Sequence, residues 1–195
     1  TNKNTTANLN VTDNDLLDTE NITVMLWVKF INTGSGAEYV LQKGTSSTNG
    51  WYAITKESST RIRWRIRGND GNGYITNLDF GIQNNTWYHV AGTWATPTLK
   101  VYLNGVLNAT DSTAVGVLRS ATALPLEIGP RAIPCNCSYD EIKIYNRTLN
   151  AAEILAVYSN ESLGRITGGG CVAGSECQST VCKDSYCCTN ACTAV

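Results

Sequence analysis

Apolar and polar residues alternate along several short stretches of the chain, as in β-strands that bury one face. Residues 86–94 and 99–107 form two such runs, and a short turn joins them. The second run includes Asn104-Gly105, the strongest short-range signal for a β-hairpin. Further runs rich in Val, Ile, Tyr, Trp and Thr are bounded by Gly, Asn and Ser. Because each sheet must bury its apolar face against another layer, the pattern predicts an all-β, antiparallel, two-sheet sandwich.

One stretch has a helical pattern. Residues 151–158 follow Asn150, which can act as an N-cap, and Glu153 stands at the third helical position. These two residues form an Asn variant of the capping box. We therefore expect one short helix near the end of the sandwich, and about 160 residues suffice for one sizeable core.

Five segments, in order, resemble the signature of laminin-G-like domains, which have the concanavalin A-like jelly roll. The main one is the hairpin WYHVAGTW followed by LKVYLNGVL, at residues 87–94 and 99–107. The others are NITVMLWVKF (21–30), VLQKG (40–44), LPLEIG (124–129) and YDEIKIYNRTLN (139–150). The resemblance implies a jelly roll over residues 1–163 with a noncatalytic binding role, toward carbohydrate or a protein partner.

The start of the chain departs from this family pattern. Domains of this family usually open with a two-part segment that contains the first strand. Here only residues 7–11 resemble the second part, and the first part has no match. An open sheet edge recruits strands from other molecules. This favours a second hypothesis, a glycosylated structural subunit of an extracellular filament or surface coat in which a neighbouring copy completes the sheet.

The chain carries 15 basic and 16 acidic residues, so its near-neutral charge implies no general attraction to nucleic acid. No apolar run approaches the length of about 18 residues that a membrane span requires. The chain begins at Thr1 without a signal peptide, which suggests a mature, processed form or a cut fragment.

Six of the eight cysteines lie in the last 25 residues, where large aliphatic residues are scarce. We predict that residues 164–195, led by glycines, form a small disulfide-rich module, as in secreted proteins. Zinc is the alternative, but there is no Cys-x2-Cys pair and the single histidine, His89, is far upstream. Because disulfides persist in oxidising surroundings, we expect the protein to lie outside the cell or at the cell surface. The six are Cys171, Cys177, Cys182, Cys187, Cys188 and Cys192.

The other two cysteines, Cys135 and Cys137, lie inside the sandwich. Cysteines two positions apart rarely bridge each other, because the ring is strained. Two alternatives remain: they pair with tail cysteines and clamp the tail to the sandwich, or they form an unusual local loop while the tail closes three bonds. Sequence alone does not choose among the connectivities that eight cysteines allow.

Asn-x-Ser/Thr acceptor sequences occur eight times, about twice the roughly four expected by chance. They predict N-linked glycans that shield sheet surfaces and edges. The alternative is a polar, Asn- and Thr-rich surface with accidental matches. The sites are Asn4, Asn10, Asn21, Asn84, Asn108, Asn136, Asn146 and Asn160.

Arginine alternates with apolar residues over positions 61–67, RIRWRIR. On a strand the apolar set faces the core, and the arginines line the other face about 7 Å apart. Such a row repels itself unless an anion lies across it, so we predict a stripe that binds acidic or sulfated glycan. The alternative is a satisfied charge ladder with Asp70, Asp79 or Glu57. The stripe consists of Arg61, Arg63, Arg65 and Arg67.

Aromatic side chains are the usual platforms for sugars. Trp51 and Tyr74 follow turn sequences, so we name them as candidate exposed ligand contacts. The remaining tryptophans lie inside family strands, and we expect them to fill the core. These are Trp27, Trp64, Trp87 and Trp94.

Calcium is common in the resembled family, and Asp140 occupies the motif position whose carboxylate could hold it. The Asp-Gly loop that often accompanies such sites is replaced here, and a hard cation needs several oxygen ligands. Catalysis is not expected, because the paired carboxylates of related glucanases, Glu-x-Asp-x-x-Glu, are absent from the sequence. His89 lies in a family strand, where we expect a structural role.

Overall fold

The computed structural model describes residues 9–32, 34, 36–47, 51–114, 116, 123–130, 135–167, 181–183 and 186–188. The chain divides into two compact units, Thr1–Asn150 and Ala151–Val195. This division groups the helix with the second unit, whereas the sequence placed the helix at the end of the jelly roll. The extent of the cysteine-rich module as a domain of its own stays a prediction.

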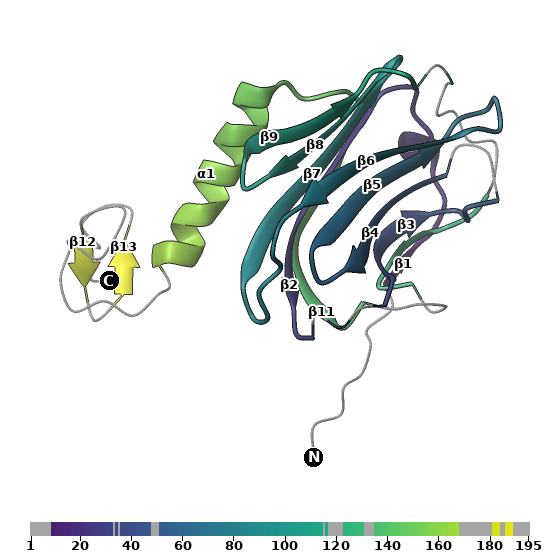
Figure 1. The fold of residues 1–195 in the computed structure, drawn as a ribbon. Helices are drawn as coiled ribbons and strands as arrows, with labels where there is room; N and C mark the ends of the chain where they lie inside the picture. The colour runs from purple at the N-terminus through teal and green to yellow at the C-terminus, as the bar shows by residue number, and fades with distance from the viewer. Residues whose placement is uncertain are drawn as a thin grey trace. The chain divides into compact units, whose positions relative to one another are not determined.

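The first unit consists of two antiparallel sheets, visible as two layers in Figure 1. The six-stranded sheet has the order β1-β10-β3-β4-β5-β6, and the five-stranded sheet has the order β11-β2-β7-β8-β9. This confirms the predicted two-sheet jelly roll. The first sheet contains β1 (Leu9–Val11), β10 (Leu126–Ile128), β3 (Glu38–Lys43), β4 (Tyr52–Ser58), β5 (Arg61–Arg67) and β6 (Gly73–Asp79). The second contains β11 (Cys137–Tyr145), β2 (Ile22–Phe30), β7 (Trp87–Ala95), β8 (Thr98–Leu103) and β9 (Val106–Asp111).

The core lies between the sheets and is built from alternate residues of each strand. In β5, Ile62, Trp64 and Ile66 are buried while the arginines between them are not. In β2, every second residue from Ile22 to Phe30 joins the same cluster. The period-2 pattern of the sequence therefore assigned the inward positions of β5 correctly.

The hairpin between β8 and β9 forms where Asn104-Gly105 predicted it. Both turn residues have positive φ, 49° and 78°, as a two-residue type I′ turn requires. The Asn104 side chain also accepts a hydrogen bond from the His89 backbone N–H at 3.0 Å, and the Asn104 N–H donates to the His89 carbonyl at 2.8 Å. The turn is thereby fixed to β7 as well.

A disulfide joins Cys135 to Cys137, with the two Cα atoms 5.3 Å apart. The structure therefore has the local loop, and the alternative in which these two cysteines clamp the tail is wrong. In extended chain, residues two apart point to the same side, and neighbouring backbone fixes this segment. Cys135 N–H donates to the Tyr39 carbonyl at 3.2 Å, and the Asn136 carbonyl accepts from Ile31 N–H at 2.9 Å.

The second unit contains α1 (Ala151–Thr167) and a hairpin of β12 (Val181–Lys183) with β13 (Tyr186–Cys188). The helix is confirmed and is longer than the 151–158 expected. Cys182 and Cys187 are register partners in the hairpin. Cys171, Cys177 and Cys192 lie outside the described residues, as do the side chains of the other three tail cysteines, so the three-bond module stays a prediction.

Candidate functional site

The four arginines of β5 lie side by side on the outer face of the six-stranded sheet. Their alternation with buried Ile62, Trp64 and Ile66 confirms the predicted orientation. We call the surface that they form the arginine face. It consists of Arg61, Arg63, Arg65 and Arg67.

Arg61 is neutralised by its cross-strand partner on β6. The Arg61 Nε donates to Asp79 Oδ1 at 2.5 Å, and the Arg61 Nη2 donates to Asp79 Oδ2 at 3.1 Å. This hydrogen bond lowers the pKa of the Asp79 carboxyl and raises the pKa of the Arg61 guanidinium. The pair is solvent-exposed, so its net stabilisation is small.

Arg63 and Arg65 share one carboxylate. Arg63 Nη1 donates to Glu57 Oε2 at 2.9 Å, and Arg63 Nε donates to Asn77 Oδ1 at 3.1 Å. Arg65 Nη1 lies 3.5 Å from Glu57 Oε1. The single negative charge of Glu57 thus faces two positive charges, so these two arginines are only partly neutralised.

Arg67 makes no ion pair with any described residue, and its Nε is buried without a hydrogen bond. The predicted charge ladder is therefore formed by Asp79 and Glu57 and does not extend to Asp70, which bonds to Asn72 and Tyr74 instead. On β4, β5 and β6 together, two outward carboxylates face four guanidinium groups. The arginine face keeps a net positive charge at its Arg67 end.

Trp51 is not the exposed platform that its turn position suggested. Its side chain is 3% exposed, and the Arg65 guanidinium lies over its ring, 5.3 Å from the centroid. The prediction failed because exposure after a turn depends on the neighbouring strand, and β5 supplies a long side chain that covers the indole. Trp51 therefore contacts the arginine face on its inner side, through a cation–π contact with Arg65.

Tyr74 also differs from the expectation. It packs against the core, with its ring stacked on Trp94 at a centroid distance of 6.2 Å. Its hydroxyl donates to Asp70 Oδ2 at 2.6 Å and thereby lowers the pKa of that carboxyl. The register places Tyr74 opposite Ile66, which is an inward position of β5. Tyr74 is therefore a structural residue rather than a free sugar platform.

Of the tryptophans expected in the core, only Trp64 and Trp94 lie between the sheets. Trp27 and Trp87 occupy the outer face of the five-stranded sheet, where Lys29 Nζ lies 5.0 Å above the Trp87 ring. His89 is fully buried and meets Trp27 edge to face, 5.5 Å between centroids. The structural reading of His89 agrees with this packing.

Asp140 is exposed at an irregularity in β11, and its carboxylate accepts the Glu141 backbone N–H at 2.9 Å. No group of three or more His, Cys, Asp or Glu side chains able to hold a metal occurs in the described ranges. A calcium ion at Asp140 stays a prediction that the structure does not test.

Two lysines that sequence reasoning did not single out carry the buried positive charges. Lys43 Nζ contacts Asp13 Oδ1 at 2.6 Å, Asp18 Oδ1 at 3.2 Å and the Leu124 carbonyl at 2.7 Å. Lys56 Nζ contacts Glu38 Oε1 at 3.2 Å and the carbonyls of Gly34 and Gly36. The signal that could have identified them is parity, because Lys43 stands two residues after buried Leu41 and Lys56 two residues after buried Ile54.

The acceptor asparagines for N-glycosylation are mostly placed at the surface. Asn136 is half-buried between the bridged cysteines, and Asn4 lies outside the described residues. Their modification stays a prediction. The exposed sites are Asn10, Asn21, Asn84, Asn108, Asn146 and Asn160.

The two stacked antiparallel sheets define a jelly-roll domain. A laminin-G-type family model, described as the concanavalin A-like lectin/glucanases superfamily, matches residues 3–155. The chain belongs to this superfamily. No curated protein matches the sequence. Among the described residues, no helix is long and apolar enough to cross a membrane.

Solved structures similar to this chain include receptor-binding domains of botulinum neurotoxins. That of mosaic serotype C/D has a TM-score of 0.66 and 16% identity over 84% of this chain and 42% of its own. That of neurotoxin DC in complex with rat synaptotagmin II has a TM-score of 0.64, 14% identity and coverages of 84% and 41%. At such identities the likeness shows the fold. The chain spans about two fifths of these structures' length.

Proposed function

We propose that this chain is a noncatalytic, extracellular recognition module that binds an anionic carbohydrate through the arginine face. The observation that carries this proposal is the excess of guanidinium groups over carboxylates on β4, β5 and β6, with Arg67 left unpaired by the described residues. Guanidinium groups bind carboxylate and sulfate through paired hydrogen bonds. A row spaced about 7 Å apart along a rigid strand suits a ligand with repeated negative charges.

Other observations support the proposal. A solved structure similar to this one belongs to a study of botulinum neurotoxin type C in which cell entry depends on two ganglioside molecules, and another holds synaptotagmin II. Those ligands belong to the toxins, whose binding domains extend well beyond the part that this chain matches, and the shared jelly roll supports a carbohydrate or protein partner for this chain only as a proposal. The acceptor asparagines and cysteine-rich tail favour the cell exterior. The sequence lacks the carboxylate pattern of the glucanases, which favours binding over hydrolysis.

The test is retention of the whole chain on an immobilised sulfated polysaccharide, eluted with a salt gradient. We expect Arg67→Gln to elute at clearly lower salt than the parent, because the guanidinium with no carboxylate partner is lost. Arg65→Gln should act in the same direction. The matched control is Lys29→Gln, which removes one positive charge from the other sheet and should leave retention unchanged.

Two results would overturn the proposal. The parent could fail to be retained at low salt, or Lys29→Gln could lower the elution salt as much as Arg67→Gln does. The second result would mean that retention follows net charge rather than this face. Circular dichroism of each variant confirms that the strands are intact.

A second candidate function, the subunit of a filament or coat, is favoured by β1. It is a three-residue edge strand that pairs only with β10 in the described part of the chain, and its Leu9 and Val11 are 57% and 40% exposed. An open apolar edge is a template for another strand. Light scattering at micromolar concentration distinguishes the two candidate functions. A chain that stays monomeric at this concentration is incompatible with a filament or coat subunit.

A further inference from the structure

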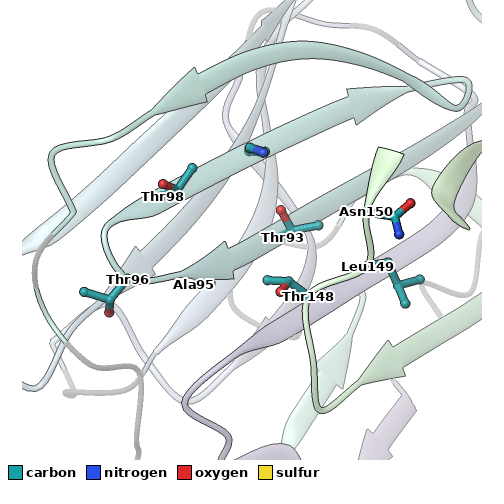
Figure 2. A pocket seen from close by; sticks show the side chains of 8 residues that line it. Thr93, Ala95, Thr96, Thr98, Thr148, Leu149 and Asn150 are labelled. Carbon is teal, nitrogen blue, oxygen red and sulfur yellow. The ribbon is translucent and has the colours of Figure 1, made fainter. Parts of the chain in front are cut away.

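A hollow of about 350 Å³ lies at the end of the five-stranded sheet where β7 turns into β8 (Figure 2). All of its lining residues belong to the first unit. We call it the threonine pocket. The side chains that matter here are Thr93, Ala95, Thr98, Lys100, Thr148 and Leu149.

The floor of the threonine pocket is the outer face of a hairpin. Thr93 on β7 and Lys100 on β8 are cross-strand partners, and Thr98 pairs with Ala95 at the next outward position. Side chains at such positions stand next to one another on one face of the sheet. The floor is therefore rigid and presents hydroxyl groups next to one ammonium group.

The wall is the segment that follows β11, and it is fixed by one buried threonine. The Thr23 hydroxyl donates to the Arg147 carbonyl at 2.8 Å and accepts the Leu149 N–H at 2.8 Å. Thr23 is the register partner of Thr93, so this double hydrogen bond holds Thr148 and Leu149 beside the floor. Figure 2 shows Thr93, Thr98 and Thr148 gathered around the hollow.

Four of the polar side chains that line the threonine pocket are not used by the fold, whereas the Thr96 hydroxyl donates to the Gly116 carbonyl. No described residue makes a hydrogen bond or ion pair with the side chains of Thr93, Thr98, Thr148 or Lys100. Thr93 is only 3% exposed. Thr98, Thr148 and Lys100 are half-buried, so their hydroxyl and ammonium groups are available to a molecule that enters the hollow. On the arginine face, by contrast, most of the guanidinium groups already have partners.

The chemistry of the lining selects a ligand class. Hydroxyls both donate and accept hydrogen bonds, and Lys100 adds one positive charge with three donors. The lining contains no aromatic ring, so recognition cannot rest on stacking, while Ala95 and Leu149 offer a small apolar contact. The volume lies within the range of small-molecule sites. These features fit a compact, polyhydroxylated molecule with one negative charge.

We propose that the threonine pocket binds a single acidic sugar residue, with its carboxylate on Lys100 and its ring hydroxyls on Thr93, Thr98 and Thr148. This site lies on the sheet opposite to the arginine face. Binding at the threonine pocket is therefore independent of binding at the arginine face, and a variant can lose one site and keep the other.

The test is saturation-transfer NMR on the full chain, with glucuronic acid as the probe and glucose as the neutral counterpart. We expect a clear transfer signal for glucuronic acid and little for glucose. Lys100→Gln should weaken glucuronic acid binding about tenfold, which is typical for loss of a charged hydrogen bond. Thr98→Val keeps the shape of the side chain and should weaken it less. Lys29→Gln, on the same sheet outside the pocket, is the control and should not change it.

Three outcomes would overturn the proposal. Equal binding of glucose and glucuronic acid would show that Lys100 does not select the ligand. Loss of binding in Arg67→Gln, with Lys100→Gln unaffected, would place the sugar on the arginine face instead. Absence of signal from both sugars would show that the pocket does not bind this class. Thermal denaturation of Lys100→Gln and Thr98→Val shows whether each variant is folded.

Discussion

At the scale of single residues, one contact between the two sheets depends on the absence of a side chain. Trp64 extends from β5 across the core and lies against Gly92 in the middle of β7. Its indole Nε1–H donates to the Thr93 carbonyl at 3.1 Å. A methyl group on Gly92 would overlap the indole ring itself. The glycine of the sequence WYHVAGTW is thus explained by packing against one tryptophan.

We predict that Gly92→Ala destabilises the protein by about 1–3 kcal/mol, because the added methyl forces Trp64 or β7 to move. Urea denaturation followed by tryptophan fluorescence measures the change. The control is Gly36→Ala, where an added Cβ has open space, and it should stay within about 0.5 kcal/mol of the parent. Unchanged stability in Gly92→Ala would contradict the packing described here.

At the scale of elements, β3 is tied to distant segments by an internal ammonium group. Lys43 ends β3 and is 1% exposed. It joins two aspartates that precede β2 to the carbonyl of Leu124, just before β10. Burial raises the pKa of Asp18, and the hydrogen bond from Lys43 opposes this shift. The ammonium therefore compensates carboxylates that the fold has partly removed from water.

We expect Lys43→Met to cost about 3–5 kcal/mol of stability, because removal of one partner leaves the buried carboxylates uncompensated. Chemical denaturation measures this cost, with Lys29→Met as the control for loss of a half-buried lysine that makes no ion pair with the described residues. The deficit should shrink as the solution is made acidic, because burial raises the pKa of Asp18 and protonation of that carboxyl removes a charge that lost its partner. A deficit that does not depend on pH would argue for lost packing alone.

Element by element, the sequence predicts orientation better than exposure. The alternation of RIRWRIR fixed which side of β5 faces the core, because side-chain direction in a strand has a strict period of two. Nothing local showed that Arg65 would cover Trp51, or that Tyr74 would stack on Trp94. Those contacts depend on the register of neighbouring strands, which a single run of residues does not encode.

At the scale of the whole molecule, the order of family segments was sufficient to predict two stacked sheets. It did not predict the threonine pocket, whose wall and floor are brought together by Thr23, far from Leu149 in sequence. Nor did it predict that Trp27 and His89 would be buried on the outer face of the five-stranded sheet. Burial on an outer face depends on which segments return across it, and that is a property of the tertiary fold.

Global stability should depend on two buried phenols, Tyr52 and Tyr139. Burial raises the pKa of both hydroxyls, with nearby carboxylates adding to the effect. In the unfolded chain a tyrosine ionises near pH 10. Because the folded pKa is the higher one, the stability that these groups contribute is fully present below about pH 10 and is lost above it, where only the unfolded state releases the protons.

We therefore predict that the free energy of unfolding falls steeply between about pH 10 and pH 12, and that Tyr52→Phe with Tyr139→Phe makes this fall less steep. Guanidinium denaturation at a series of pH values measures it, and phenolate absorbance shows that the two hydroxyls ionise only on unfolding. The Tyr52 hydroxyl is buried with no hydrogen-bond partner among the described residues. Near neutral pH, Tyr52→Phe should consequently be neutral or stabilising by about 1 kcal/mol, because a desolvated hydroxyl is removed with little loss of packing. An equally steep fall in the double variant would mean that lysine deprotonation, rather than these phenols, causes the alkaline transition.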